Sequence, residues 1–137
     1  MTATDDLAPE RLPRLVAIGL AAGRLAIGAG IWLAPERSWK ALGFGDRRPE
    51  GPALVLGRLA ATRDLAIGAW TLAALEDPER LRRVVATVAT VDGADSLAFA
   101  LVLREGPELR QAAIRGLVAA VPATLVGAWA ASRLTAA

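Results

Sequence analysis

GRLAATRDLAIGAW, residues 57–70, places two arginines and an aspartate inside an apolar run that extends over residues 52–75. The charged residues are Arg58, Arg63 and Asp64. A helix of this length is long enough to cross a bilayer. A charge at the bilayer centre costs roughly 2.5–3.5 kcal/mol on insertion scales, whereas each Leu, Ile or Val returns only about 0.3–0.6 kcal/mol. The segment is therefore expected to enter a membrane only beside partner helices that take its charges inward.

Three further apolar stretches approach the same length. The first of them contains one charge and no Ser, Thr, Asn or Gln, so it offers no polar face to water as a helix of a soluble bundle would. The sequence predicts an all-α fold, a four-helix transmembrane bundle with short connectors, as one domain of the cell membrane over residues 1–137. A soluble four-helix bundle is the alternative, because no stretch has eighteen consecutive uncharged residues. The expected helices cover residues 15–34, 52–75, 84–103 and 112–132.

Charged residues recur at the middle of the first three stretches. Antiparallel helices with short connectors would bring these middles to one depth, where three positive and three negative side chains sum to zero. Two of the carboxylates are spaced i, i+3 and share a helix face. The six residues expected in this layer are Arg24, Arg58, Arg63, Asp64, Asp92 and Asp95.

A short echo links the first two stretches. Arg24 opens RLAIGAGIW and Asp64 opens DLAIGAW, and in both a glycine follows the charged residue at i+4. These glycines, Gly28 and Gly68, lie on the same helix face as the charge. A residue without a side chain at this position leaves room for a neighbouring helix or a ligand.

Composition excludes several kinds of chemistry. There is no Cys, His or Tyr, and Lys40 is the only lysine. Thiolate and imidazole chemistry are therefore absent, no cofactor is implied, and no metal site is predicted. Asp92-Gly-Ala-Asp95 leaves open a magnesium–diphosphate motif, although the chain carries few further acidic residues in its apolar stretches. Net charge is +2 without a basic stripe, so nucleic-acid binding has no support.

Buried ionisable groups in a membrane point to a functional site. The favoured hypothesis is a membrane enzyme that acts on a lipophilic small molecule by isomerisation, cyclisation or ring-opening. Asp92, Asp95 and Asp64 would move protons. The substrate would be held by Arg24, Arg58 and Arg63.

Two other functions fit the same residues. One is a proton- or ion-coupled transporter or channel, formed as a homo-oligomer because four helices enclose little space. The other is a non-catalytic assembly subunit in which the charges form structural salt bridges.

Short motifs spread over about residues 15–105 resemble the small integral membrane proteins grouped as domain of unknown function 4267. They are Gly23-Arg24, Ala34-Pro35, Leu42-Gly43-Phe44, Arg63-Asp64-Leu65 with Gly68, and Asp92 with Asp95. The resemblance implies a four-helix membrane protein. It implies no activity, because none is established for that family.

Overall fold

The computed structural model describes residues 8–45 and 49–134, with side chains from residue 11 onward. These residues form five helices and no strand. The helices are α1 (Ala8–Leu33), α2 (Pro35–Ala41), α3 (Gly51–Ala73), α4 (Pro78–Val102) and α5 (Pro107–Arg133).

The all-helical class is confirmed, but the four-helix transmembrane bundle is wrong. The described residues form five helices, and three of them are long and apolar enough to cross a membrane: Arg11–Leu33, Pro78–Val102 and Pro107–Arg133. The second predicted span, α3, is not among them, because Arg58, Arg63 and Asp64 put three charges into the middle of its 23 residues. The three apolar helices fit a helical membrane protein.

Proline sets most of the helix starts. Helices α2, α3, α4 and α5 each have a proline in their first two positions, where its missing N–H leaves no hydrogen bond unmade. Asp77 caps α4 by accepting a 2.9 Å hydrogen bond from the Arg80 backbone N–H. Helices α1, α4 and α5 begin earlier than expected, because their polar first turns look like connector in the sequence.

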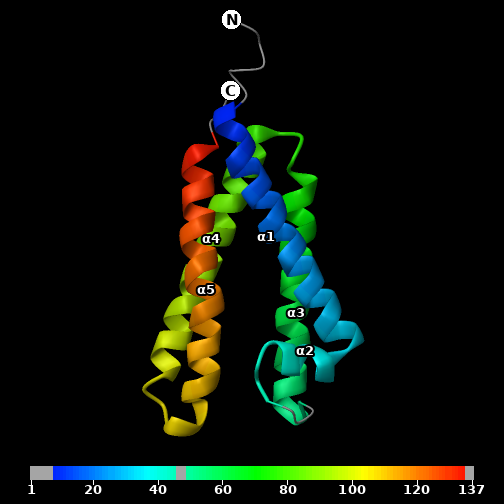
Figure 1. Cartoon of the computed structure of the whole chain (residues 1–137), viewed down its shortest axis with the longest axis vertical. Helices are drawn as coiled ribbons and strands as arrows, with labels where there is room; N and C mark the ends of the chain where they lie inside the picture. The colour runs from blue at the N-terminus through cyan, green and yellow to red at the C-terminus, as the bar shows by residue number, and fades with distance from the viewer. Residues whose placement is uncertain (1–7, 46–48, 135–137) are drawn as a thin grey trace, which may run out of the picture.

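The helices form two antiparallel pairs, α1 with α3 and α4 with α5 (Figure 1). The pairs meet at the end where α1 begins and diverge toward the end that holds α2 and the turn between α4 and α5 (Figure 1). Buried apolar residues join the pairs at the meeting end. They are Ala17, Ala74, Leu81, Val84, Val85, Val88, Ala130, Ala131 and Leu134.

The sequence echo corresponds to a reciprocal fit between α1 and α3. A Cβ on Gly28 would come within 2.8 Å of the Leu65 side chain, and a Cβ on Gly68 within 2.8 Å of the Leu25 side chain. Leu65 of α3 therefore packs against Gly28 of α1, and Leu25 of α1 packs against Gly68 of α3. A neighbouring helix, rather than a ligand, occupies both positions.

Candidate functional site

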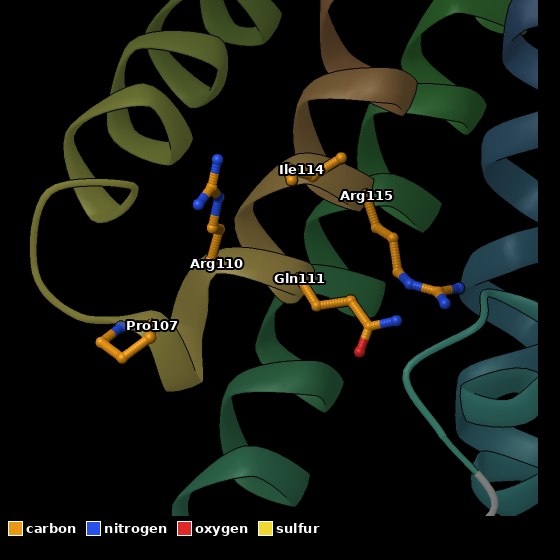
Figure 2. Close-up of a pocket in the computed structure, with 5 residues that line it drawn as sticks. All are labelled: Pro107, Arg110, Gln111, Ile114 and Arg115. Carbon is orange, nitrogen blue, oxygen red and sulfur yellow. The ribbon is translucent and has the colours of Figure 1, made fainter.

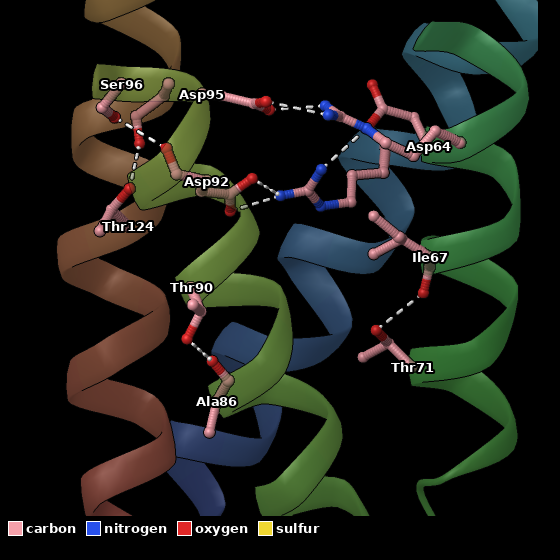
Figure 3. Close-up of polar contacts among 12 residues, drawn as sticks. Asp64, Ile67, Thr71, Ala86, Thr90, Asp92, Asp95, Ser96 and Thr124 are labelled. Carbon is pink, nitrogen blue, oxygen red and sulfur yellow. Dashed lines mark hydrogen bonds and ion pairs between the residues drawn. The ribbon is translucent and has the colours of Figure 1, made fainter. Parts of the chain in front are cut away.

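Arg24 lies where three helices come together. Its Nη1 donates a 2.9 Å hydrogen bond to Asp64 Oδ1 on α3. Its Nη2 lies 2.5 Å from both carboxylate oxygens of Asp92 on α4. One guanidinium of α1 therefore contacts its own partner helix and the other helix pair (Figure 3).

A second arginine links α3 to α4. Arg63 donates to both oxygens of Asp95, at 2.9 and 2.6 Å, in the two-bond geometry that suits a guanidinium and a carboxylate. Its Nη2 also lies 4.0 Å from Asp64 Oδ1. The charged side chains thus form one continuous line, called here the charge chain: Asp95, Arg63, Asp64, Arg24 and Asp92 (Figure 3).

Helix geometry explains why α4 meets both arginines. Asp92 and Asp95 are spaced i, i+3, so they lie on one face about one turn apart. That face of α4 is turned toward the α1·α3 pair, where Arg24 and Arg63 come from different helices. The charge chain consequently connects the two helix pairs near the middle of their length.

The two ends of the charge chain differ in exposure. The side chains of Arg24 and Asp92 are 13% and 7% exposed, and that of Asp64 is 18% exposed. Arg63 and Asp95 are 43% and 28% exposed. The Asp92 end is therefore closed in by protein, whereas the Asp95 end is accessible.

The structure brings together five of the six predicted residues. Arg58 lies apart, with its guanidinium carbon 5.4 Å from the ring centroid of Trp32, in the geometry of a cation–π contact. Trp32 in turn donates to Thr62 Oγ1 at 3.2 Å. The sequence analysis missed this contact, although Trp32 near the end of α1 and Arg58 in the early turns of α3 were both visible signals. Without Arg58 the expected neutral layer has two arginines and three aspartates.

Asp64 differs from the other two carboxylates in its hydrogen bonds. Both oxygens of Asp92 contact Arg24, and both oxygens of Asp95 accept from Arg63. From the part of the chain that the structure describes, Asp64 accepts a hydrogen bond only at Oδ1. Its Oδ2 is the carboxylate oxygen of the charge chain that is open to a proton or a ligand.

A small void of about 10 Å³ adjoins the buried end of the charge chain. Its lining includes Arg24, Asp92 and Thr71, and Thr71 is a buried polar residue that the sequence analysis did not single out. Thr71 donates to the Ile67 carbonyl oxygen at 2.9 Å. The void has room for about one water molecule at most, so no organic ligand fits there.

Within residues 8–45 and 49–134, no three His, Cys, Asp or Glu residues are grouped as metal ligands. Asp92 and Asp95, the residues of the magnesium alternative, each contact an arginine instead.

Comparison with family models, with curated proteins and with solved structures found no match to this chain. The resemblance to the membrane family 4267 therefore stays a prediction, and the functional argument depends on the site itself.

Proposed function

We propose that the protein is a multi-pass protein of the cell membrane that catalyses proton transfer on a lipophilic small molecule, with Asp64 as the residue that carries the proton. One observation supports this above all: three aspartates share two arginines in the charge chain. An unbalanced negative charge is costly in a low-dielectric medium. One of the three carboxyl groups is therefore expected to hold a proton.

The hydrogen bonds favour Asp64 as the holder of that proton. Protonating Asp92 or Asp95 would disturb an oxygen that faces an arginine, whereas Asp64 Oδ2 accepts no hydrogen bond from a described residue. Asp64 Oδ1 remains held by Arg24 in either state of protonation. The carboxyl group thus has one oxygen that is fixed and one that is available to a substrate.

The chemistry that follows is isomerisation or cyclisation started by protonation. Asp64 donates its proton to one carbon of a carbon–carbon double bond, and positive charge develops on the neighbouring carbon. A C–H bond next to that charge then breaks and its proton returns to Asp64, so the double bond has moved and no net oxidation has occurred. Between these steps Arg24 and Arg63, whose Nη1 and Nη2 lie 2.9 and 4.0 Å from Asp64 Oδ1, stabilise the carboxylate.

Access to the site favours an enzyme over a channel. Helix α4 runs from the end where the helix pairs meet toward the end where they diverge (Figure 1). Asp95 follows Asp92 along α4, so the accessible Arg63–Asp95 end of the charge chain is the one nearer the diverging end. Beyond Arg24 and Asp92 the helices pack on Ala17, Val85 and Val88, and the void there holds at most about one water. An ion path through the protein would have to cross this apolar core, whereas a one-sided site needs no such path.

The structural alternative also has an observation in its favour. In the described part of the chain, no buried side-chain nitrogen or oxygen lacks a hydrogen-bond partner. A layer that only fixes helix positions would show this as well, and in such a layer Asp64 would serve as a charged link between α3 and α1 through Arg24. The two functions therefore differ in what they predict for Asp64.

Infrared spectroscopy and isotope exchange test the proposal together. The infrared spectrum of the wild-type protein is expected to contain the C=O stretching band of a protonated carboxyl group. The frequency of this band should change in the variant Asp64→Glu and should stay the same in the matched control Asp95→Glu. Incubation with a membrane lipid extract in deuterated water should place deuterium on carbon in one lipophilic component, and Asp64→Asn should abolish this. A wild-type spectrum without a protonated carboxyl band, or deuterium incorporation that survives Asp64→Asn, would overturn the proposal.

A further inference from the structure

The first turns of α5 form a depression of about 470 Å³ on the surface of the protein. Figure 2 shows Arg110 and Arg115 leaving the helix on opposite sides of Gln111. The two guanidinium groups point away from each other, and the Gln111 side chain lies between the two arginines (Figure 2). The residues that line the depression are Pro107, Arg110, Gln111, Ile114 and Arg115.

The depression lies where lipid headgroups would be. Helix α5 has 27 residues, which at about 1.5 Å per residue span about 40 Å, whereas the hydrocarbon core of a bilayer is about 30 Å thick. The ends of α5 therefore extend into the headgroup region. Arg110 lies in the first turn of α5, close to the headgroup region. Arg115 lies more than one turn further into the helix, and its long side chain can extend from the hydrocarbon region back toward the headgroups.

Arg115 contacts the connector that follows α2. Its Nη1 donates to the Leu42 carbonyl oxygen at 3.5 Å, a long hydrogen bond. The guanidinium lies against Gly43, which has φ +77°, and a Cβ there would overlap it. The arginine is therefore already positioned, yet the contact is weak enough for a stronger acceptor to replace it.

The charges around the depression favour an anion. Within the described residues, neither Arg110 nor Arg115 forms an ion pair with a carboxylate. The nearby Glu108 carboxylate is turned toward Gly106, where a Cβ would come within 2.5 Å of it, and Glu108 does not line the depression. Arginines match the geometry of phosphate oxygens, and Ile114 supplies an apolar surface for the adjoining part of a lipid.

We infer that this depression binds the phosphate group of an anionic membrane lipid, with Arg110, Gln111 and Arg115 as hydrogen-bond donors. The site is separate from the charge chain and needs no proton transfer. A bound phosphate would compete with the Leu42 carbonyl for Arg115. Free phosphate shares this chemistry, so the experiment has to distinguish the two sources.

Native mass spectrometry of the protein from vesicles of phosphatidylglycerol and phosphatidylcholine tests this inference. The wild-type protein is expected to retain phosphatidylglycerol in preference to phosphatidylcholine. In the double variant Arg110→Gln, Arg115→Gln, the ratio of bound phosphatidylglycerol to bound phosphatidylcholine should fall by about tenfold, roughly the effect of one strong ionic contact. The matched control, Arg80→Gln with Arg82→Gln, removes equal charge from the exposed first turns of α4. Arg110→Gln alone leaves the Leu42 contact intact and should weaken retention to an intermediate level.

Equal loss in the α4 control would overturn the site, because it would show general attraction between arginines and anionic lipid. A second arm adds inorganic phosphate at increasing concentration. Phosphatidylglycerol should stay bound, since the apolar part of the lipid contributes to retention. Displacement by inorganic phosphate at low concentration would overturn the assignment to a lipid and point to a soluble ligand.

Discussion

The two arginine–aspartate pairs of the charge chain have the same chemistry and very different surroundings. The side chains of Arg24 and Asp92 are 13% and 7% exposed, whereas those of Arg63 and Asp95 are 43% and 28% exposed. Removing one partner of a buried pair leaves an uncompensated charge in a low dielectric, but an accessible charge can relax toward polar groups. Position, rather than pairing chemistry, should therefore decide which arginine holds the fold together.

Arg24→Gln is expected to have the largest effect. It removes the hydrogen-bond partner of Asp64 and the ion-pair partner of Asp92, so the Asp92 carboxylate loses its compensation next to the apolar core. The free energy of unfolding should fall by about 3–5 kcal/mol, measured as thermal unfolding in one detergent. A fall no greater than that of Arg63→Gln would show that burial does not distinguish the two pairs.

Arg63→Gln is expected to have a smaller effect on stability. It removes the partner of Asp95, which is accessible, and leaves Arg24 with its two carboxylates. The loss should be about 1 kcal/mol, within the range of hydrogen bonds measured between membrane helices. Arg58→Gln serves as the control for removing an arginine from α3, because Arg58 stacks on Trp32 outside the charge chain.

Asp64→Asn is expected to have the smallest effect of the three. The asparagine oxygen can still accept the hydrogen bond from Arg24, and the remaining two arginines and two aspartates balance in charge. The free energy of unfolding should stay within about 0.5 kcal/mol of wild type. If the free energy of unfolding, measured by thermal unfolding, falls as far as in Arg63→Gln, then Asp64 is a structural partner and carries no excess proton.

The depth of each charge along its apolar stretch correctly grouped five of the six charges that were expected to meet. Arg24, Arg63, Asp64, Asp92 and Asp95 lie near the middle of their helices, and helices of similar length with short connections align their middles. Arg58 was misplaced because its position depends on one side-chain contact, with Trp32, that hydropathy does not encode. Its absence changes the net charge of the site and with it the proposed chemistry.

The arrangement in two pairs was not predictable. The apolar stretches have no marked polar face, so their hydrophobic pattern does not say which sides pack together. The structure resolves this through contacts at Gly28 and Gly68, whose significance depends on which leucine approaches them. The short helix α2 was missed because seven residues between a proline and a glycine-rich connector look like loop.

The reciprocal fit of α1 and α3 has a consequence for how these helices recognise one another. Because each presents Leu-Ala-Ile-Gly to the other, two copies of α1 could pack with nearly the same shape. The residue before the motif breaks this equivalence, since it is Arg24 in one helix and Asp64 in the other. Pairing of two α1 helices would oppose two arginines, whereas the correct pair joins Arg24 to Asp64 by a 2.9 Å hydrogen bond that Asp64 accepts in either state of protonation. This single difference between the two copies of the motif favours pairing of α1 with α3 over pairing of α1 with a second α1.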